Sequence, residues 1–173
     1  MIAGAYKGRR LQAPAGRSTR PTADRVREAV FSILGPLEGE RVLDLFAGSG
    51  ALGIEALSRG AESAVFVDSD PRSVAAIVRN LRAVGADAPV HRREVLAYLA
   101  NPIEAPFTLV FLDPPYSSAD ELAGPLSERL PAVLSENARI VSESDKRRPL
   151  ELTLPLMDER TYGDTRIAIH HDR

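Results

Sequence analysis

Short apolar segments alternate with amphipathic segments along most of this chain, and this alternation restricts its possible folds more than any other feature. The apolar segments predict strands at residues 41–46, 64–68, 90–92, 107–113, 138–143 and 165–170. Apolar side chains at helical spacing predict helices at residues 22–34, 50–59, 71–81, 94–100 and 119–134. Because strands that are apolar throughout must be covered on both faces, we expect an α/β fold with a doubly wound, mostly parallel sheet and helices on both sides.

The two ends of the chain depart from this alternation. The first dozen residues predict a short β-hairpin around a glycine-containing turn, and residues 13–21 are typical of a loop. We therefore expect residues 1–21 to form an N-terminal hairpin arm and residues 22–173 to form the main domain. The tail, residues 150–172, predicts β-strands, and we expect the last strands to pair antiparallel at one edge of the sheet.

Composition narrows the class of protein. A chain of 173 residues with 44% hydrophobic residues fits one globular domain. No apolar run approaches the roughly 20 residues that cross a bilayer, and the N-terminus lacks the apolar core of a secretory signal. We therefore expect a cytoplasmic protein without membrane contact. The absence of cysteine excludes disulfides and thiolate metal sites, and the histidines, His91, His170 and His171, predict no metal site.

Charge is distributed unevenly. In residues 1–30, seven basic and two acidic side chains give a net charge of +5, whereas fifteen basic and twenty-two acidic side chains in the remainder give −7. A basic arm on an acidic body indicates a polyanion bound at one end, although a solvated Arg-rich surface would look the same. The candidate basic contacts are Lys7, Arg9, Arg10, Arg17, Arg20 and Arg25.

A glycine loop follows the first predicted strand of the sheet. Gly48, Gly50 and Gly53 form a G-x-G-x-x-G pattern, and Asp68 follows about 20 residues later, as in dinucleotide-binding proteins. Asp44, at the end of the preceding strand, argues against a dinucleotide because its carboxylate would oppose a pyrophosphate. S-adenosylmethionine, which carries a sulfonium and an ammonium and no phosphate, suits that carboxylate better.

Ligands bind a doubly wound sheet at the carboxyl ends of its strands. Asp68 can accept the ribose hydroxyl hydrogens there, although it can also simply cap a loop. Glu94 can face the adenine, or it can be an acidic residue in the first turn of a helix. The residues at these strand ends that we expect to bind the cofactor are Asp44, Phe46, Gly48, Gly50, Asp68, Ser69, Glu94 and Asp113.

The sequence Asp113-Pro-Pro-Tyr116 closes the strand at 107–113. Two prolines form a stiff, extended turn, and the Pro114 carbonyl is free to accept hydrogen bonds. The Asp113 carboxylate and this carbonyl can hold both hydrogens of an exocyclic amine, orienting the nitrogen lone pair for methyl transfer. Asp113 is then the proton acceptor, and Tyr116 can stack on a base that has left its helix. We predict that Asp113, Pro114 and Tyr116 are catalytic.

Taken together, these motifs resemble those of the bacterial ribosomal-RNA guanine-N2 methyltransferases of the RsmD type. The resemblance runs nearly from end to end, and its characteristic part is the segment at 20–28. The other matching segments are Ile2-Ala-Gly, Gly8-Arg-Arg-Leu11, 44–57, Asp113-Pro-Pro-Tyr116 and Tyr162-Gly-Asp-Thr165. Asp-Pro-Pro-Tyr is also found in DNA amine methyltransferases, so the segment at 20–28 narrows the choice.

The resemblance implies a Rossmann-like class I methyltransferase fold with a seven-stranded sheet and S-adenosyl-L-methionine as cofactor. It implies methyl transfer to N2 of one guanine of 16S rRNA, at position 966, within the 30S subunit or a late assembly intermediate. It assigns RNA binding to the basic arm and to Tyr116, and it brings Thr22 and Arg25 towards the methionine end of the cofactor. Nothing in the sequence requires more than a monomer.

Four alternatives share some of these features. A DNA amine methyltransferase uses the same chemistry but usually has a separate target-recognition region. A protein-glutamine methyltransferase more often carries Asn-Pro-Pro-Tyr. A non-catalytic assembly factor would not need an intact Asp113, Pro114 and Tyr116. An NAD-dependent oxidoreductase would leave this tetrapeptide unexplained.

Overall fold

A seven-stranded sheet with the strand order β3-β2-β1-β4-β5-β7-β6 forms the centre of the protein. The computed structural model describes residues 1–16 and 21–172, and of residues 21–23 only the backbone. From β3 to β5 all pairs are parallel, whereas β7 runs antiparallel to both of its neighbours. The strands are β1 (Arg41–Leu45), β2 (Ser63–Asp68), β3 (Val90–Arg92), β4 (Phe107–Leu112), β5 (Leu134–Asp145), β6 (Leu156–Tyr162) and β7 (Thr165–His171).

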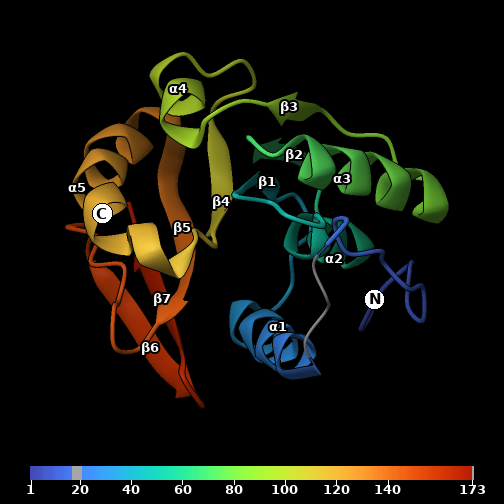
Figure 1. Cartoon of the computed structure of the whole chain (residues 1–173), viewed down its shortest axis with the longest axis horizontal. Helices are drawn as coiled ribbons and strands as arrows, with labels where there is room; N and C mark the ends of the chain where they lie inside the picture. The colour runs from blue at the N-terminus through green and yellow to red at the C-terminus, as the bar shows by residue number, and fades with distance from the viewer. Residues whose placement is uncertain (17–20, 173) are drawn as a thin grey trace.

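Helices cover both faces of the sheet, as Figure 1 shows. One face packs against α1 (Pro21–Leu34), α2 (Ala51–Ser58) and α3 (Pro71–Val84). The other packs against α4 (Val95–Ala100) and α5 (Ala119–Arg129). The fold class predicted from the alternating pattern is therefore confirmed, including the antiparallel strands at one edge.

The predicted helix at 119–134 is wrong in its last part. The α-helix ends at Arg129, a 3₁₀ helix covers Leu130–Val133, and β5 already begins at Leu134. Pro131 has no N–H to continue the helical ladder, and the side chains of Leu130 and Val133 are fully buried on the sheet. Strand β5 is consequently longer than the predicted strand at 138–143.

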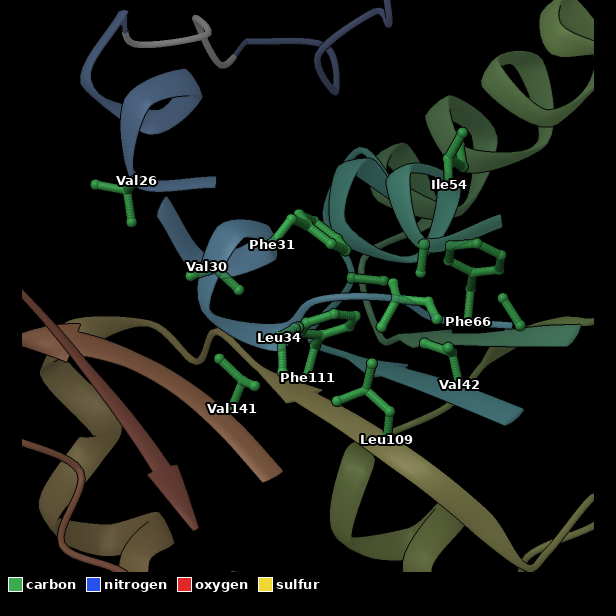
Figure 2. Packing of buried hydrophobic residues seen from close by; sticks show 14 of the residues in the cluster. Val26, Val30, Phe31, Leu34, Val42, Ile54, Phe66, Leu109, Phe111 and Val141 are labelled. Atoms are coloured by element: carbon green, nitrogen blue, oxygen red, sulfur yellow. The ribbon is translucent and has the colours of Figure 1, made fainter. Parts of the chain in front are cut away.

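Helix α1 covers the strands next to the functional end of the sheet. Its apolar side chains Val26, Val30 and Phe31 lie in one cluster with Phe111 of β4 and Val141 of β5, as Figure 2 shows. The rings of Phe31 and Phe111 have centroids 5.7 Å apart. Burial of each such side chain stabilises the fold by about 1.5–3 kcal/mol, so packing fixes α1 above β4 and β5.

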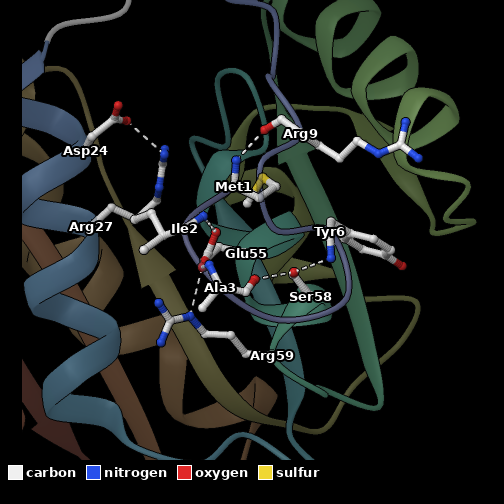
Figure 3. Close-up of polar contacts among 10 residues, drawn as sticks. All are labelled: Met1, Ile2, Ala3, Tyr6, Arg9, Asp24, Arg27, Glu55, Ser58 and Arg59. Atoms are coloured by element: carbon white, nitrogen blue, oxygen red, sulfur yellow. Dashed lines mark hydrogen bonds and ion pairs between the residues drawn. The ribbon is translucent and has the colours of Figure 1, made fainter.

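The predicted N-terminal β-hairpin is wrong, because residues 1–16 contain turns and no strand. Their backbone groups bind side chains of α2 instead of a second strand (Figure 3). The N–H groups of Ile2 and Ala3 donate to the two carboxylate oxygens of the buried Glu55, at 2.9 and 3.0 Å. The N–H of Tyr6 donates to Ser58 Oγ at 2.8 Å. The arm is thus held on α2 by buried polar side chains.

Gly4 lies at the closest approach of the arm to α2. It has a positive φ of 79°, and a Cβ there would lie 1.7 Å from the carbonyl oxygen of Ser58. Further along the arm, the N–H of Gln12 donates to Asn80 Oδ1 at 2.8 Å, and Asn80 Nδ2 donates to the carbonyls of Gln12 and Ser49, both at 2.9 Å. One side chain of α3 therefore links the arm to the glycine loop.

Candidate active site

A cavity of about 740 Å³ opens at the carboxyl ends of β1, β2, β4 and β5, beneath the start of α1. It brings together residues that are far apart in the sequence, and most of the predicted site residues line it. These are Asp44, Phe46, Gly48, Asp68, Ser69, Glu94, Asp113, Pro114 and Tyr116. The side chain of Thr22, also predicted to bind the cofactor, lies outside the described residues.

Asp44 is almost completely buried, with an exposed fraction of 1%. Its Oδ2 accepts a hydrogen bond from the N–H of Gly53 at 2.9 Å. Burial raises the pKa of Asp44 to about 8, the hydrogen bond from Gly53 lowers it, and the charge of Asp68 raises it further. A cationic ligand would stabilise the ionised carboxyl here, and an anionic one would not.

Asp68 holds the glycine loop against the end of β2. Its Oδ2 accepts from the N–H of Gly48 at 2.9 Å, and its Oδ1 accepts from the N–H of Asp70 at 2.9 Å. Each carboxylate oxygen keeps capacity for a further hydrogen bond. The two interpretations of Asp68, as a loop cap and as a cavity-lining acceptor, are therefore compatible.

The glycines of the loop have different roles. Gly48 lines the cavity with a φ of 58°. Gly50 begins α2 with a φ of 78° and does not line the cavity, so its predicted cofactor contact stays a prediction. Gly53 is a packing residue, because a Cβ there would lie 2.4 Å from the ring of Phe66. Phe46, just before the loop, also has a left-handed backbone, with a φ of 57°.

Ser69 and Glu94 lie at the rim of the same end of the sheet, and both side chains are exposed. Glu94 is the residue preceding α4, and its side chain makes no capping hydrogen bond to that helix. Glu94 also lines the cavity, and its contact with the adenine stays a prediction.

The tetrapeptide at 113–116 leaves the buried end of β4 and lines the cavity. The side chains of Asp113 and Tyr116 are exposed, whereas Pro114 between them is buried. The carbonyl of Pro115 accepts from the N–H of Ser118 at 3.0 Å, which begins the short 3₁₀ helix Tyr116–Ser118. The stiff turn thus presents an acid and an aromatic ring side by side at the cavity.

Sequence reasoning missed Glu143, which lies near the carboxyl end of β5 and lines the cavity. Burial raises the pKa of Glu143, and a hydrogen bond with the Tyr116 side chain lowers it. The rule that places ligands at the carboxyl ends of parallel strands would have found it, because Glu143 closed the predicted strand at 138–143.

Two further cavity residues come from α1. Arg27 Nη2 donates to Asp24 Oδ1 at 2.8 Å, and both residues line the cavity. Arg27 Nε is buried and has no hydrogen-bond partner among the described residues. The amphipathic pattern of the helix located its apolar face but not this cation.

Those predicted basic contacts that the structure describes do not line the cavity. Lys7, Arg9, Arg10 and Arg25 are exposed. Arg17 and Arg20 lie outside the described residues. No helix in the part of the chain that the structure describes is long and apolar enough to cross a membrane, and no cluster of metal-binding side chains is found there.

A family model described as "Conserved hypothetical protein 95" matches residues 1–171. The chain belongs to this family. Ribosomal RNA small subunit methyltransferase D of Haemophilus influenzae is 37% identical over 172 residues, covering 94% of this chain and 88% of that protein. The resemblance to the RsmD type is therefore confirmed.

Solved structures of other methyltransferases have a similar fold. The yhhF protein of Escherichia coli has a TM-score of 0.83 and 33% identity, covering 99% of this chain and 96% of that chain. The T. thermophilus 16S rRNA N2 G1207 methyltransferase (RsmC), solved with AdoMet and guanosine, has a TM-score of 0.76 and 24% identity. The match covers 92% of this chain and 45% of the RsmC chain. The Rossmann-like class I methyltransferase fold is confirmed.

Proposed function

We propose that this protein transfers a methyl group from S-adenosyl-L-methionine to the exocyclic N2 of one guanine in 16S rRNA, with guanine 966 as the target. One observation carries the proposal. The Asp113-Pro114 acceptor pair and the buried Asp44 carboxyl line the same cavity, so an amine and a cationic methyl donor can be held next to each other. The relative named Ribosomal RNA small subunit methyltransferase D supports an rRNA substrate.

The residues of the cavity fit this cofactor. Asp44 is a buried carboxyl whose pKa is raised mainly by burial, so a cationic ligand beside it would favour its ionised form. Asp68 fixes the glycine loop and retains acceptor capacity for ribose hydroxyls. When bound, the cofactor supplies an electrophilic methyl group on its sulfonium.

The protein supplies orientation and a proton acceptor. The Asp113 carboxylate and the Pro114 carbonyl accept hydrogen bonds from the two amine hydrogens, which directs the nitrogen lone pair away from them. With the cofactor bound, the oriented nitrogen would take up the methyl group released from the sulfonium, and Asp113 would accept the proton that the nitrogen loses. Tyr116 stacks on the flipped base and keeps it in the cavity.

The test uses small ribosomal subunits purified from cells that lack this gene. Purified protein and labelled cofactor are added to these subunits, to late assembly intermediates and to naked 16S rRNA, and the product nucleosides are identified by mass spectrometry. We expect N2-methylguanosine in the RNA, and primer extension maps its position. Transfer to another position would refute only the target site.

The same experiment separates the alternatives. Methyl transfer to DNA or to a protein, without transfer to any of the three RNA substrates, would refute the proposal. Calorimetry with NAD in place of S-adenosyl-L-methionine checks the cofactor independently, and we expect no binding heat from NAD. Cofactor binding without transfer to any of these substrates would favour a non-catalytic assembly factor.

A further inference from the structure

Glu143 lies in the cavity, yet the proposed transfer does not use it. It lies on β5, where its backbone partner across the antiparallel pair is Ile167 of β7. Its side chain is hydrogen-bonded to Tyr116, the last residue of the tetrapeptide. A carboxyl is therefore held beside the residues that hold the amine, on a different strand.

The surroundings of Glu143 form a mainly apolar slot between α1 and the sheet. Val141, two residues earlier on the same face of β5, lines the cavity together with Ile167, Val26 and Val30. Figure 2 shows Val26 and Val30 of α1 on the same side of the sheet as Val141. Asp24, also on α1, is 69% exposed and paired with Arg27. The slot suits a flat, apolar ring whose hydrogen-bonding edge faces Glu143 and Asp113.

The three bases with exocyclic amines differ at the ring nitrogen beside the amine. In guanine the amine lies between N1, which carries a hydrogen and is a donor, and N3, which carries a lone pair. In adenine and cytosine the ring nitrogen beside the amine, N1 or N3, carries a lone pair and is an acceptor. A carboxylate accepts hydrogen bonds and does not donate them, so it pairs with the guanine edge and repels the other two.

We propose that Glu143 is the specificity-determining residue of the site. Its carboxylate accepts the N1–H of the target guanine while Asp113 and Pro114 hold the 2-amine, and it thereby selects guanine over adenine and cytosine. This inference rests on the proposed function. It explains how the tetrapeptide Asp-Pro-Pro-Tyr, which serves amine methylation generally, is restricted to one base in this cavity.

The electrostatics of the free protein support this role. Burial raises the pKa of Glu143, which shows that its carboxylate has lost more solvation than the hydrogen bond from Tyr116 restores. A donor N–H delivered by the substrate compensates for this loss. Stacking on Tyr116 and pairing with Glu143 would then act on the same base, because these two side chains are hydrogen-bonded to each other.

The test compares two bases that both carry a 2-amine. Small-subunit RNA is prepared by ligation with either guanine or 2-aminopurine at the target position and assembled into subunits. The 2-aminopurine base keeps the reacting amine but has a lone pair at N1. We expect the wild-type protein to prefer guanine by roughly 100-fold in kcat/KM, since a buried acceptor left facing a lone pair discriminates strongly.

Glu143→Gln is the decisive variant, because its amide can donate to the N1 lone pair. We expect its preference for guanine to fall by about 10-fold or more relative to wild type. Glu143→Asp keeps the carboxylate and should retain the preference even if its turnover is lower. Glu136→Gln, the same change at an exposed position of the same strand, should leave both rates unchanged.

The outcomes separate this inference from the proposed function. Parallel loss of both activities in Glu143→Gln, with an unchanged base preference, would mean that Glu143 only supports the fold and would overturn its assignment. The same conclusion would follow if wild type methylated both bases equally. Failure of wild type to methylate guanine in any RNA would refute the proposed function itself, and this inference with it.

Discussion

The two halves of the cavity use their carboxyl groups differently. On the side of β1 and β2, Asp44 and Asp68 accept hydrogen bonds from backbone N–H groups of the glycine loop and of α2. On the side of β4 and β5, Asp113 and Tyr116 are exposed, and Glu143 is joined to Tyr116. In the half on the side of β1 and β2, the locked half, backbone hydrogen bonds fix the carboxylates. The half on the side of β4 and β5, the open half, presents its side chains to the cavity.

This difference fits the proposed function, in which the half on the side of β1 and β2 binds the cofactor and the other half binds the target base. A small cofactor is best held by a site that is already ordered, because less entropy is lost on binding. A base that must leave an RNA helix needs a site into which it can enter before it is held. We therefore predict that changes in the two halves separate cofactor affinity from methyl transfer.

The largest effect is expected for Asp113→Ala in the open half. We expect the rate of methyl transfer to fall by about 1000-fold or more, because an oriented acceptor and proton acceptor are lost together. The dissociation constant of the cofactor, measured by calorimetry, should change little. Asp120→Ala, an exposed acid nearby on α5, is the control and should retain normal turnover. Near-normal turnover of Asp113→Ala would refute the mechanism.

Asp44→Asn tests the locked half. We expect cofactor affinity to fall by at least about 30-fold, since removal of one partner from a buried charge pair costs about 2 kcal/mol or more. Methyl transfer at saturating cofactor should fall much less. Titration calorimetry measures the first quantity and single-turnover kinetics the second. Equal losses in both would remove the distinction between the halves.

Asp44→Asn should weaken cofactor binding but increase the stability of the folded protein. The pKa of Asp44 is about 8 in the folded protein and 3.8 as the ordinary value. Between these values the folded state holds a proton that the unfolded state has released, so the free energy of unfolding falls as the pH rises. Asn cannot ionise, so urea denaturation should show Asp44→Asn to be the more stable protein at pH 8, by on the order of 1 kcal/mol or more, and this gain should disappear near pH 4.

Gly53→Ala tests how tightly the locked half is packed. Its Cβ would lie 2.4 Å from the buried Phe66 ring and 3.1 Å from Asp44 Oδ2. We expect a loss of about 1–3 kcal/mol in the free energy of unfolding, as for other overpacked cores. Phe66→Leu in the same chain should recover part of this loss, which a double-mutant cycle measures. Additive effects would show that the two residues do not contact each other.

The smallest effect is expected outside both halves, at the basic arm. Removal of charge in Arg9→Ala with Arg10→Ala should weaken RNA binding only modestly. The slope of log affinity against log salt should decrease by about 0.7–0.9 for each phosphate that the arm no longer neutralises. Arg160→Ala, on the edge strand β6, is the matched control. An unchanged slope in the arm variant would indicate that these residues do not bind RNA.

Sequence reasoning was most successful where function is encoded locally. Asp44, Gly48 and Asp68 follow a short motif whose spacing fixes their relation to one helix and two strands, and the structure places all three at the cavity. The tetrapeptide 113–116 was located by the same logic, because it ends an apolar strand. Family resemblance added the substrate, which no spacing in this chain reveals.

Sequence reasoning failed where a partner lies far along the chain. The first dozen residues have the turns of a hairpin, but Glu55 and Ser58 offer them better hydrogen-bond partners than a second strand would. Glu143 was overlooked although it closes a predicted strand, and only the structure shows its hydrogen bond to Tyr116, 27 positions earlier.

The sequence alone determined the alternating architecture and the positions of the cofactor loop and the tetrapeptide, because periodicity and short motifs act through neighbours in the chain. Only the tertiary structure decided that Asp44 is buried enough to have a raised pKa, that the arm is bound to α2 and that Glu143 is hydrogen-bonded to Tyr116 at the cavity. Burial and long-range hydrogen bonds depend on which distant segments pack together, and no local pattern contains that information.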